Sequence, residues 1–162
     1  MTILINKKFM DDLSTQARTS PRLRSHFNLH GSLEDLVQRV YIGAQPGTYI
    51  RPHAHMQVHK WEYISIIRGA VDFLLFSPQG VLEQRIPLQA GGETTAIEMA
   101  AGTWHTLMVQ QPDTILFEVK QGPFDAASNA EFADWAPQEN TPAVADFMQQ
   151  LLALDIGAEI KS

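Results

Sequence analysis

The amino-acid sequence predicts an all-β protein, either a sandwich or a barrel, with a helix near each end of the chain. Eight short runs rich in β-branched and aromatic residues follow one another between Gln38 and Lys120. Turn-forming residues separate the runs, for example at Pro46-Gly47 and at Gly91-Gly92. Apolar residues at helical spacing flank this region on both sides. Short strands at such close spacing are typical of sandwiches and barrels.

The first element is predicted to be a helix from Asn6 to about Thr19. Asn6 is a suitable N-cap, because its side chain can accept a hydrogen bond from the first turn. Ser20-Pro21 ends the helix, since the residue before a proline is pushed out of the helical region. Four apolar residues form a stripe that packs against the core or against a second copy of the chain: Phe9, Met10, Leu13 and Ala17.

The strands are predicted from period-two patterns that end at turn signals. Residues 21–32 show no clear period and are interpreted as an ordered loop or an irregular edge, which is either a solvated connection or, as the less favoured alternative, a segment in contact with a ligand. The strands on either side of Gly69-Ala70 and of residues 111–113 are predicted to pair as hairpins. The eight strands are residues 38–43, 48–53, 62–67, 71–76, 81–88, 94–99, 104–109 and 114–120.

After Lys120 the strand pattern ends, and the chain is predicted to wrap around the barrel before a final helix. Thr141 is the predicted N-cap of that helix, with Pro142 at its first position. The wrapping segment has three aromatic anchors, Phe124, Phe132 and Trp135. The helix has an apolar face made of Val144, Phe147, Met148, Leu151 and Leu152.

Length and composition indicate one domain, residues 1–162, with a small-molecule partner. It divides into an N-terminal extension (1–35), a barrel (36–121) and a wrapping loop with the C-terminal helix (122–162). A net charge of -6 and the lack of a Lys- or Arg-rich block argue against nucleic-acid and membrane partners. No apolar run reaches the length of a signal peptide or membrane span, so a cytoplasmic location is expected.

The stretch from Gly47 to Gly69 carries a candidate metal site. His53 and His55 are two residues apart, and alternate residues of a strand point to the same face. Glu62 follows at the start of a β-branched run. The chain has no cysteine, so His and carboxylate are its strong metal-binding side chains. This donor set suits one divalent transition metal ion, and iron, zinc, manganese and nickel are all candidates.

A second stretch, from Glu98 to Met108, brings a third histidine, His105, onto a strand. The two stretches together resemble the paired motifs of the cupin superfamily. In the first motif, the interval from Gly47 to His53, the His-x-His pair of His53 and His55, and the interval from Glu62 to Gly69 match the family pattern. In the second motif, Gly102 and His105 match, and Ala100 stands in the place of a proline.

The spacer between His55 and Glu62 departs from the family pattern, because six residues stand where the family has three or four. His59 lies where the shorter spacing would put the glutamate, so it competes with Glu62 as the fourth ligand. Glu62 is favoured, because it keeps its interval to Gly69 and opens a strand, and extra residues before it would only lengthen a loop. His59 is then expected at a pocket rim or on the surface.

Beyond these motifs, the sequence resembles WbuC-type cupin-fold metalloproteins over nearly the whole chain. The matching segments are SPRLR, NLH, QRV, PGTYIRPHAH, KWE, GTWHTL, LFEVKQGPF and FADWAP. The resemblance implies a double-stranded β-helix, the cupin jelly-roll barrel, with a metal ion held by His53, His55, Glu62 and His105. It also implies a genomic association with O-antigen and surface-polysaccharide synthesis in bacteria, but it does not specify a reaction.

Two classes of function are compatible with these residues. The first is a metal-dependent enzyme, isomerase- or epimerase-like or oxygenase-like, that acts on a small polar or sugar-derived substrate. The second is a non-catalytic ligand-binding module with a structural metal. Strand alternation places Tyr49 and Arg51 on the face of His53 as candidate substrate-binding residues, although Arg51 could equally meet solvent or a structural carboxylate. The N-terminal stripe and the strand edges favour a homodimer.

Overall fold

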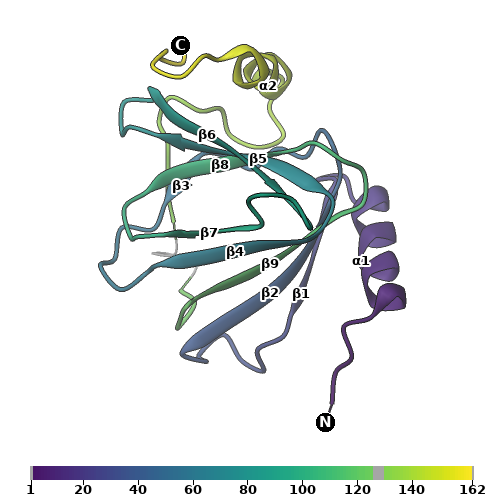
Figure 1. Cartoon of the computed structure of the whole chain (residues 1–162). Helices are drawn as coiled ribbons and strands as arrows, with labels where there is room; N and C mark the ends of the chain where they lie inside the picture. The colour runs from purple at the N-terminus through teal and green to yellow at the C-terminus, as the bar shows by residue number, and fades with distance from the viewer. Residues whose placement is uncertain (1, 126–129, 162) are drawn as a thin grey trace.

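The computed structural model describes residues 2–125 and 130–161 and has two antiparallel sheets that face each other (Figure 1). The first sheet, in the order β1-β2-β9-β4-β7, comprises Arg24–Asn28 (β1), Val37–Ala44 (β2), Thr114–Gln121 (β9), Glu62–Arg68 (β4) and Ala96–Met99 (β7). The second sheet, in the order β10-β3-β8-β5-β6, comprises Glu131–Phe132 (β10), His53–Ala54 (β3), Trp104–Val109 (β8), Ala70–Phe76 (β5) and Leu82–Gln89 (β6). Helices α1 and α2 span Lys7–Thr19 and Ala143–Ala153. The prediction of an all-β protein with a helix near each end is confirmed.

The apolar core lies between the two sheets. Val40 and Ile42 of β2 and Ile64 of β4 meet Phe73 of β5 and Leu107 of β8 in one buried cluster. Alternation along each strand places every second residue on this inner face. At one end of the same strands the inner positions carry polar side chains instead, namely Gln38, Glu62, His105, Glu118 and Lys120. The barrel interior therefore has an apolar end and a polar end.

The turns at Gly69 and at residues 111–113 carry the chain from one sheet to the other. Strand β4 pairs with β7 and β9, whereas β5, which follows Gly69, pairs with β6 and β8. Strands β8 and β9 likewise belong to different sheets. Both predicted hairpins are therefore wrong. The turn residues mark where each strand ends, but pairing depends on which sheet buries the apolar face of the next strand.

Gly69 at the first of these corners is expected to be sensitive to substitution. Its φ is 82°, which residues with a Cβ rarely adopt, and a Cβ there would clash with Thr114 Oγ1 and lie 2.9 Å from Thr114 Cα. We expect Gly69→Ala to lower the free energy of unfolding by about 2 kcal/mol or more, because backbone strain and overpacking add. Gly91→Ala is the control, since Gly91 has a φ of 69° but nothing within 4 Å of its Cβ position. Equal losses in urea unfolding would contradict the steric explanation.

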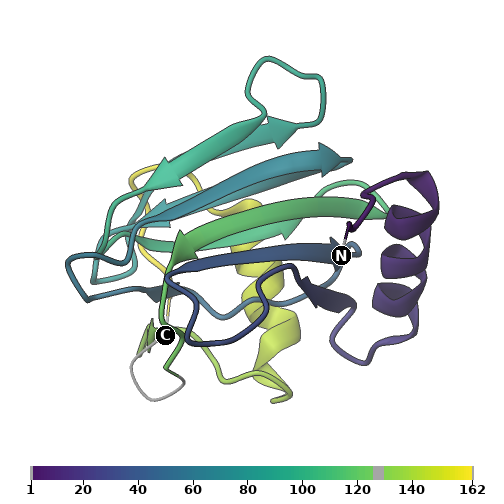
Figure 2. The same cartoon turned by 90° about the horizontal axis from the view of Figure 1, so that it is seen from below.

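Helix α1 lies against the outer face of the first sheet, beside β1 (Figure 2). The Asn6 side chain accepts a hydrogen bond of 3.0 Å from the Phe9 N–H, so the predicted N-cap is confirmed. Leu13 and Ala17 are buried against the sheet. Gly43 allows this close approach, because a Cβ there would lie 2.9 Å from Leu13 O. The apolar stripe of the helix thus packs within its own chain.

Helix α2 covers the outer face of the second sheet (Figure 1). Phe147 and Leu151 from its predicted apolar face are buried there, whereas Leu152 is 54% exposed. The predicted N-cap is wrong. Pro142 occupies the cap position and the helix begins at Ala143, while the Thr141 hydroxyl donates to Gln138 O at 2.8 Å.

The wrapping segment is anchored most firmly by Trp135. Its ring lies 5.0 Å from the ring of Phe76, and its indole N–H donates to Pro78 O at 3.1 Å. Phe132 is 50% exposed, and its ring lies 6.1 Å from that of His53. Phe124 is half-buried. The three predicted anchors therefore differ in how deeply they pack.

Two segments differ from the predicted strands. Residues 48–52 were expected to continue a strand into His53, but only His53–Ala54 is paired as β3. Pro52 has no N–H to donate to a ladder, which accounts for the late start of the strand. Residues 24–28, within the segment interpreted as a loop or irregular edge, form the edge strand β1 and pair with β2.

Within the described residues, no helix has the length and apolar character needed to cross a membrane.

Candidate metal centre

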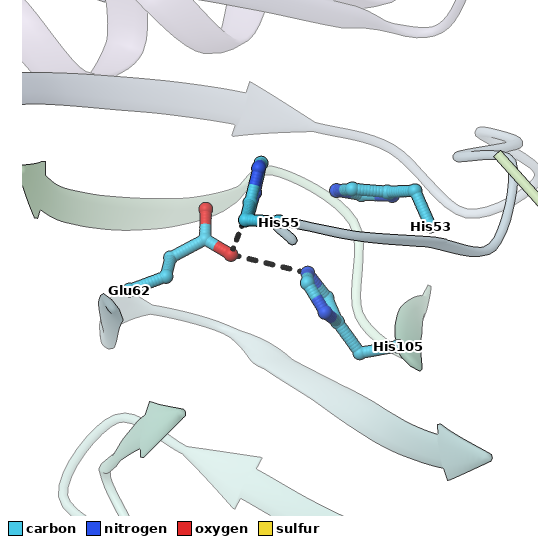
Figure 3. Close-up of side chains that lie close together, drawn as sticks. All are labelled: His53, His55, Glu62 and His105. Carbon is cyan, nitrogen blue, oxygen red and sulfur yellow. Dashed lines mark ion pairs between the residues drawn. The ribbon is translucent and has the colours of Figure 1, made fainter. Parts of the chain in front are cut away.

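Three histidines and one glutamate converge at the polar end of the barrel interior (Figure 3). His53 on β3 is the direct cross-strand partner of His105 on β8. His55 follows β3, and Glu62 begins β4 in the opposite sheet. One ligand atom from each residue lies within 4.8 Å of the others. His55, Glu62 and His105 are buried, with at most 5% of each residue exposed.

Backbone carbonyls orient two of the imidazoles. His53 Nδ1 lies 2.9 Å from Arg51 O, and His105 Nδ1 lies 2.9 Å from Thr103 O. Because a carbonyl oxygen only accepts hydrogen bonds, we assign the proton of each neutral ring to Nδ1. Nε2 then keeps a lone pair that a metal ion can use. Histidines that bind metals commonly have their other ring nitrogen held in this way.

The contacts of Glu62 require a proton or a metal ion beside its carboxylate. Its Oε2 lies 3.1 Å from His105 Nε2 and 3.5 Å from His55 Nε2 (Figure 3). A carboxylate oxygen and an imidazole lone pair repel each other unless a proton or a metal ion lies between them. Three imidazole nitrogens and one carboxylate oxygen are also a donor set that divalent transition metals prefer. The group could therefore hold a metal ion.

The pKa values of His53, Glu62 and His105 follow from burial and from the charges around them. Burial, and secondly the charge of His105, lowers the pKa of His53 to about 3, so its ring is neutral near pH 7. Burial alone would lower the pKa of His105, but the hydrogen bond and charge of Glu62 raise it above its ordinary value. Burial alone would raise the pKa of Glu62, but hydrogen bonds with His105 and His55 hold it well below its usual range.

Metal affinity is expected to fall as the pH is lowered. The pKa of His105 is raised in the metal-free protein, so below that pKa a proton occupies the position that a metal ion needs. The apparent affinity should decrease about tenfold for each pH unit below the pKa of His105, and His53 should contribute nothing until strongly acidic pH. Chelator competition at several values between about pH 5 and pH 8 measures this slope. An affinity that is constant over that range would contradict the proton-for-metal exchange.

A buried ion pair adjoins the group, and sequence reasoning missed it. Lys120 Nζ lies 2.7 Å from Glu118 Oε1 and 3.8 Å from Glu62 Oε1. Burial would lower the pKa of Lys120, but the charges of Glu118 and Glu62 raise it. The available signal was the placement of Glu118 and Lys120 two residues apart in an otherwise apolar strand, which puts both on one face.

The other predicted site residues lie apart from the four. His59 is exposed on the loop between β3 and β4. Tyr49 does not share the inner face of His53, because residues 48–52 lack strand geometry; it is buried against Phe147 of α2, and its hydroxyl donates to Pro137 O at 2.8 Å. Arg51 is nearer the group. Its guanidinium lies over the ring of Phe132, 5.4 Å from the centroid, and the ring of Phe132 lies 6.1 Å from that of His53.

Solved structures of low sequence identity share the fold of this chain. An uncharacterised protein with a double-stranded β-helix domain from Klebsiella pneumoniae superposes with a TM-score of 0.55 and 17% identity, over 83% of this chain and 99% of that chain. A cupin superfamily protein from Desulfitobacterium hafniense gives 0.50 and 13%, over 67% and 86%. A mutant salicylate 1,2-dioxygenase from Pseudoaminobacter salicylatoxidans, in complex with gentisate, gives 0.58 and 11%, over 85% and 37%. The chain therefore has the double-stranded β-helix fold of cupins, as the resemblance of its sequence implied.

The chain is thus a cupin-fold protein with a group of side chains that could hold a metal ion. Residues 5–88, over half of its length, match the family described as a domain of unknown function, DUF6016, and the chain belongs to this family. A comparison with curated proteins gave no match. The family description names no activity, so a function has to be argued from the site.

Proposed function

We propose that the protein is a cytoplasmic metal-dependent enzyme that acts on a small polar or sugar-derived substrate. His53, His55, Glu62 and His105 would hold the metal ion. The observation that supports this most directly is the convergence of one ligand atom from each of the four residues within 4.8 Å, including the 3.1 Å approach of Glu62 Oε2 to His105 Nε2, a pair that needs a proton or a metal ion between its atoms. When bound, a divalent metal would supply a Lewis acid that polarises a carbonyl or hydroxyl oxygen.

Arg51 is the side chain that we propose for holding the substrate. Its Nη2 donates to Ala133 O at 2.7 Å, which fixes the guanidinium beside Phe132 and hence near His53. Its Nε is buried and has no hydrogen-bond partner in the part of the chain that the structure describes. Buried donors are normally satisfied, so a substrate carboxylate or hydroxyl is a suitable acceptor for this group.

Cobalt substitution tests the enzyme proposal against the alternative of a structural metal. A catalytic metal keeps a coordination position open, whereas a structural metal is closed by its protein ligands. We expect the visible absorption spectrum of the Co(II)-loaded protein to change when azide is added. His53→Ala is the control, since it should take up little cobalt. If the cobalt spectrum stays constant at high azide concentration, the enzyme proposal is wrong, and the protein is a non-catalytic module with a structural metal.

The resemblance to WbuC-type proteins supports a place in bacterial surface-polysaccharide synthesis. The substrate would then be a sugar nucleotide or a small sugar-derived acid. Incubation of the anaerobically purified, metal-loaded protein with sugar nucleotides and small 2-oxo acids, followed by NMR, tests this. We expect turnover that is lost in His53→Ala. Turnover that persists in His53→Ala would contradict a role for the metal centre.

We also propose that the protein forms a homodimer through exposed strand edges. Strand β1 is the last strand on one side of the first sheet, and Val37 at the start of its neighbour β2 is 50% exposed. Leu36, which precedes Val37, is 72% exposed. Uncovered edges with apolar side chains are usually paired or capped. Light scattering at micromolar concentration should report a dimer, and a monomeric mass would contradict the proposal.

A further inference from the structure

A cavity of about 360 Å³ lies on the inner face of the first sheet and is lined by residues next to the candidate metal centre. We refer to it as the side cavity. Its volume is within the range of small-molecule sites. Leu33, Val40 and Phe124 supply apolar contacts. The polar lining comes from His26, Asn28, His30, Gln38, Glu118 and Lys120.

Strand register connects the side cavity to the candidate metal centre. Gln38 on β2 is paired with Lys120 on β9, and Lys120 is paired with Glu62 on β4. These three residues form one row across the inner face of the sheet. Lys120 lies between a residue that lines the cavity and a residue of the metal group, with its Nζ 3.8 Å from Glu62 Oε1. A ligand in the cavity therefore lies beside the metal group.

His30 presents a buried hydrogen-bond donor that nothing in the described residues uses. Its Nδ1 lies 3.0 Å from both Arg39 O and Arg39 N, and the Arg39 N–H, whose direction the backbone fixes, points at Nδ1 and needs an acceptor there, while Arg39 O already accepts the Leu29 N–H at 2.7 Å. We therefore assign the ring proton to Nε2. The residue is only 8% exposed, and Nε2 is buried without a hydrogen-bond partner. Because His30 lines the side cavity, a ligand atom that accepts a hydrogen bond is a suitable partner for this donor.

The charges around the side cavity favour one negative charge on that ligand. Lys120 Nζ and Glu118 Oε1 are 2.7 Å apart and offset each other. A divalent ion together with ionised Glu62 leaves one positive charge, which one carboxylate would balance. Lys120 and His30 both donate, and Glu118 accepts. The cavity thus combines donors for a carboxylate with an acceptor for a hydroxyl.

We propose that the side cavity binds a small hydroxylated monocarboxylate. Its carboxylate accepts hydrogen bonds from His30 Nε2 and Lys120 Nζ, and one hydroxyl donates to Glu118. This inference rests on the proposed function, because it names a ligand for a cavity that adjoins the proposed metal centre through Lys120. Neither His30 nor Lys120 belongs to the four residues assigned to the metal.

Calorimetric titration of the zinc-loaded protein with D-gluconate tests the inference. Sorbitol is the matching neutral polyol and should bind at least about tenfold more weakly, because it lacks the charged acceptor. His30→Asn keeps an acceptor for the Arg39 N–H, since the asparagine Oδ1 replaces Nδ1, but it has no group at the position of Nε2. We expect His30→Asn to weaken gluconate binding at least about tenfold without changing the zinc content.

His30→Gln and His59→Asn complete the experiment. The longer glutamine amide reaches the Nε2 position and should restore part of the affinity, whereas exposed His59 lies outside the cavity lining and its variant should match the unmodified protein. The inference is overturned if gluconate gives no binding at millimolar concentration, if sorbitol binds equally well, or if His30→Asn has no effect. If gluconate binding depends on His30 but zinc does not bind at all, the side cavity stands and the metal-dependent function fails.

Discussion

Glu62→Ala is expected to weaken metal binding by more than about 100-fold, because changing even the outer partners of metal ligands can cost 10–100-fold. The carboxylate lies 3.1 Å from His105 Nε2 and 3.5 Å from His55 Nε2, and it is the acidic member of the group. Its removal would leave three neutral donors in a buried site. Metal content after dialysis, and affinity from chelator competition, measure the loss.

Two further variants separate this effect from loss of structure. Glu62→Gln keeps the shape of the side chain but removes its charge, so it should also lose most of the metal while keeping the circular dichroism spectrum. His59→Ala should retain metal within about twofold, since His59 is exposed on a loop outside the group. If His59→Ala lost the metal and Glu62→Ala retained it, His59 would be the fourth ligand.

Phe73→Ala is expected to reduce both stability and metal affinity. Phe73 is fully buried in the core cluster, so removing its ring should lower the free energy of unfolding by about 3–5 kcal/mol. The same ring stacks on His105, with centroids 6.0 Å apart and planes at 26°. Losing this support should let the imidazole reorient and should weaken metal binding about tenfold.

Leu74→Ala is the matched control for Phe73→Ala. Leu74 is the next residue on β5 and is also fully buried, but it packs in the outer cluster beneath α2. Its truncation should cost about 2–5 kcal/mol of stability and leave metal affinity within about twofold. Urea unfolding of the metal-free variants and chelator competition give the two readouts. Equal losses of metal affinity would mean that Phe73 acts only through general stability.

The parts of the fold that depend on local patterns could be predicted from the sequence. Alternating apolar residues predicted β2, β4, β5, β6, β8 and β9, and helical spacing with an Asn6 cap predicted α1. The partners of the strands could not be predicted from the same patterns. Gly69 looks like a hairpin turn in sequence, but the strands that it joins lie in different sheets. Pairing is decided by non-local burial, which a turn residue does not encode.

The candidate site shows the same division between local and non-local information. The resemblance to the two cupin motifs, which depends on the spacing of His53 and His55, the interval from Glu62 to Gly69 and the position of His105 after Gly102, selected the residues that converge. Alternation failed for Tyr49, because it assumes a strand where Pro52 prevents one. Lys120 and His30 were not selected, since their significance arises from the register of β9 against β4 and from a buried Nε2. Such relations between distant segments appear only in three dimensions.

The most direct test of the metal centre is a crystal structure of the metal-loaded protein, with anomalous difference maps on both sides of the absorption edge of the bound metal. We expect one anomalous peak within about 2.0–2.3 Å of His53, His55, Glu62 and His105, as is usual for nitrogen and oxygen ligands. A peak at another position, or no peak between these four side chains after loading, would contradict the assignment of the group as a metal centre.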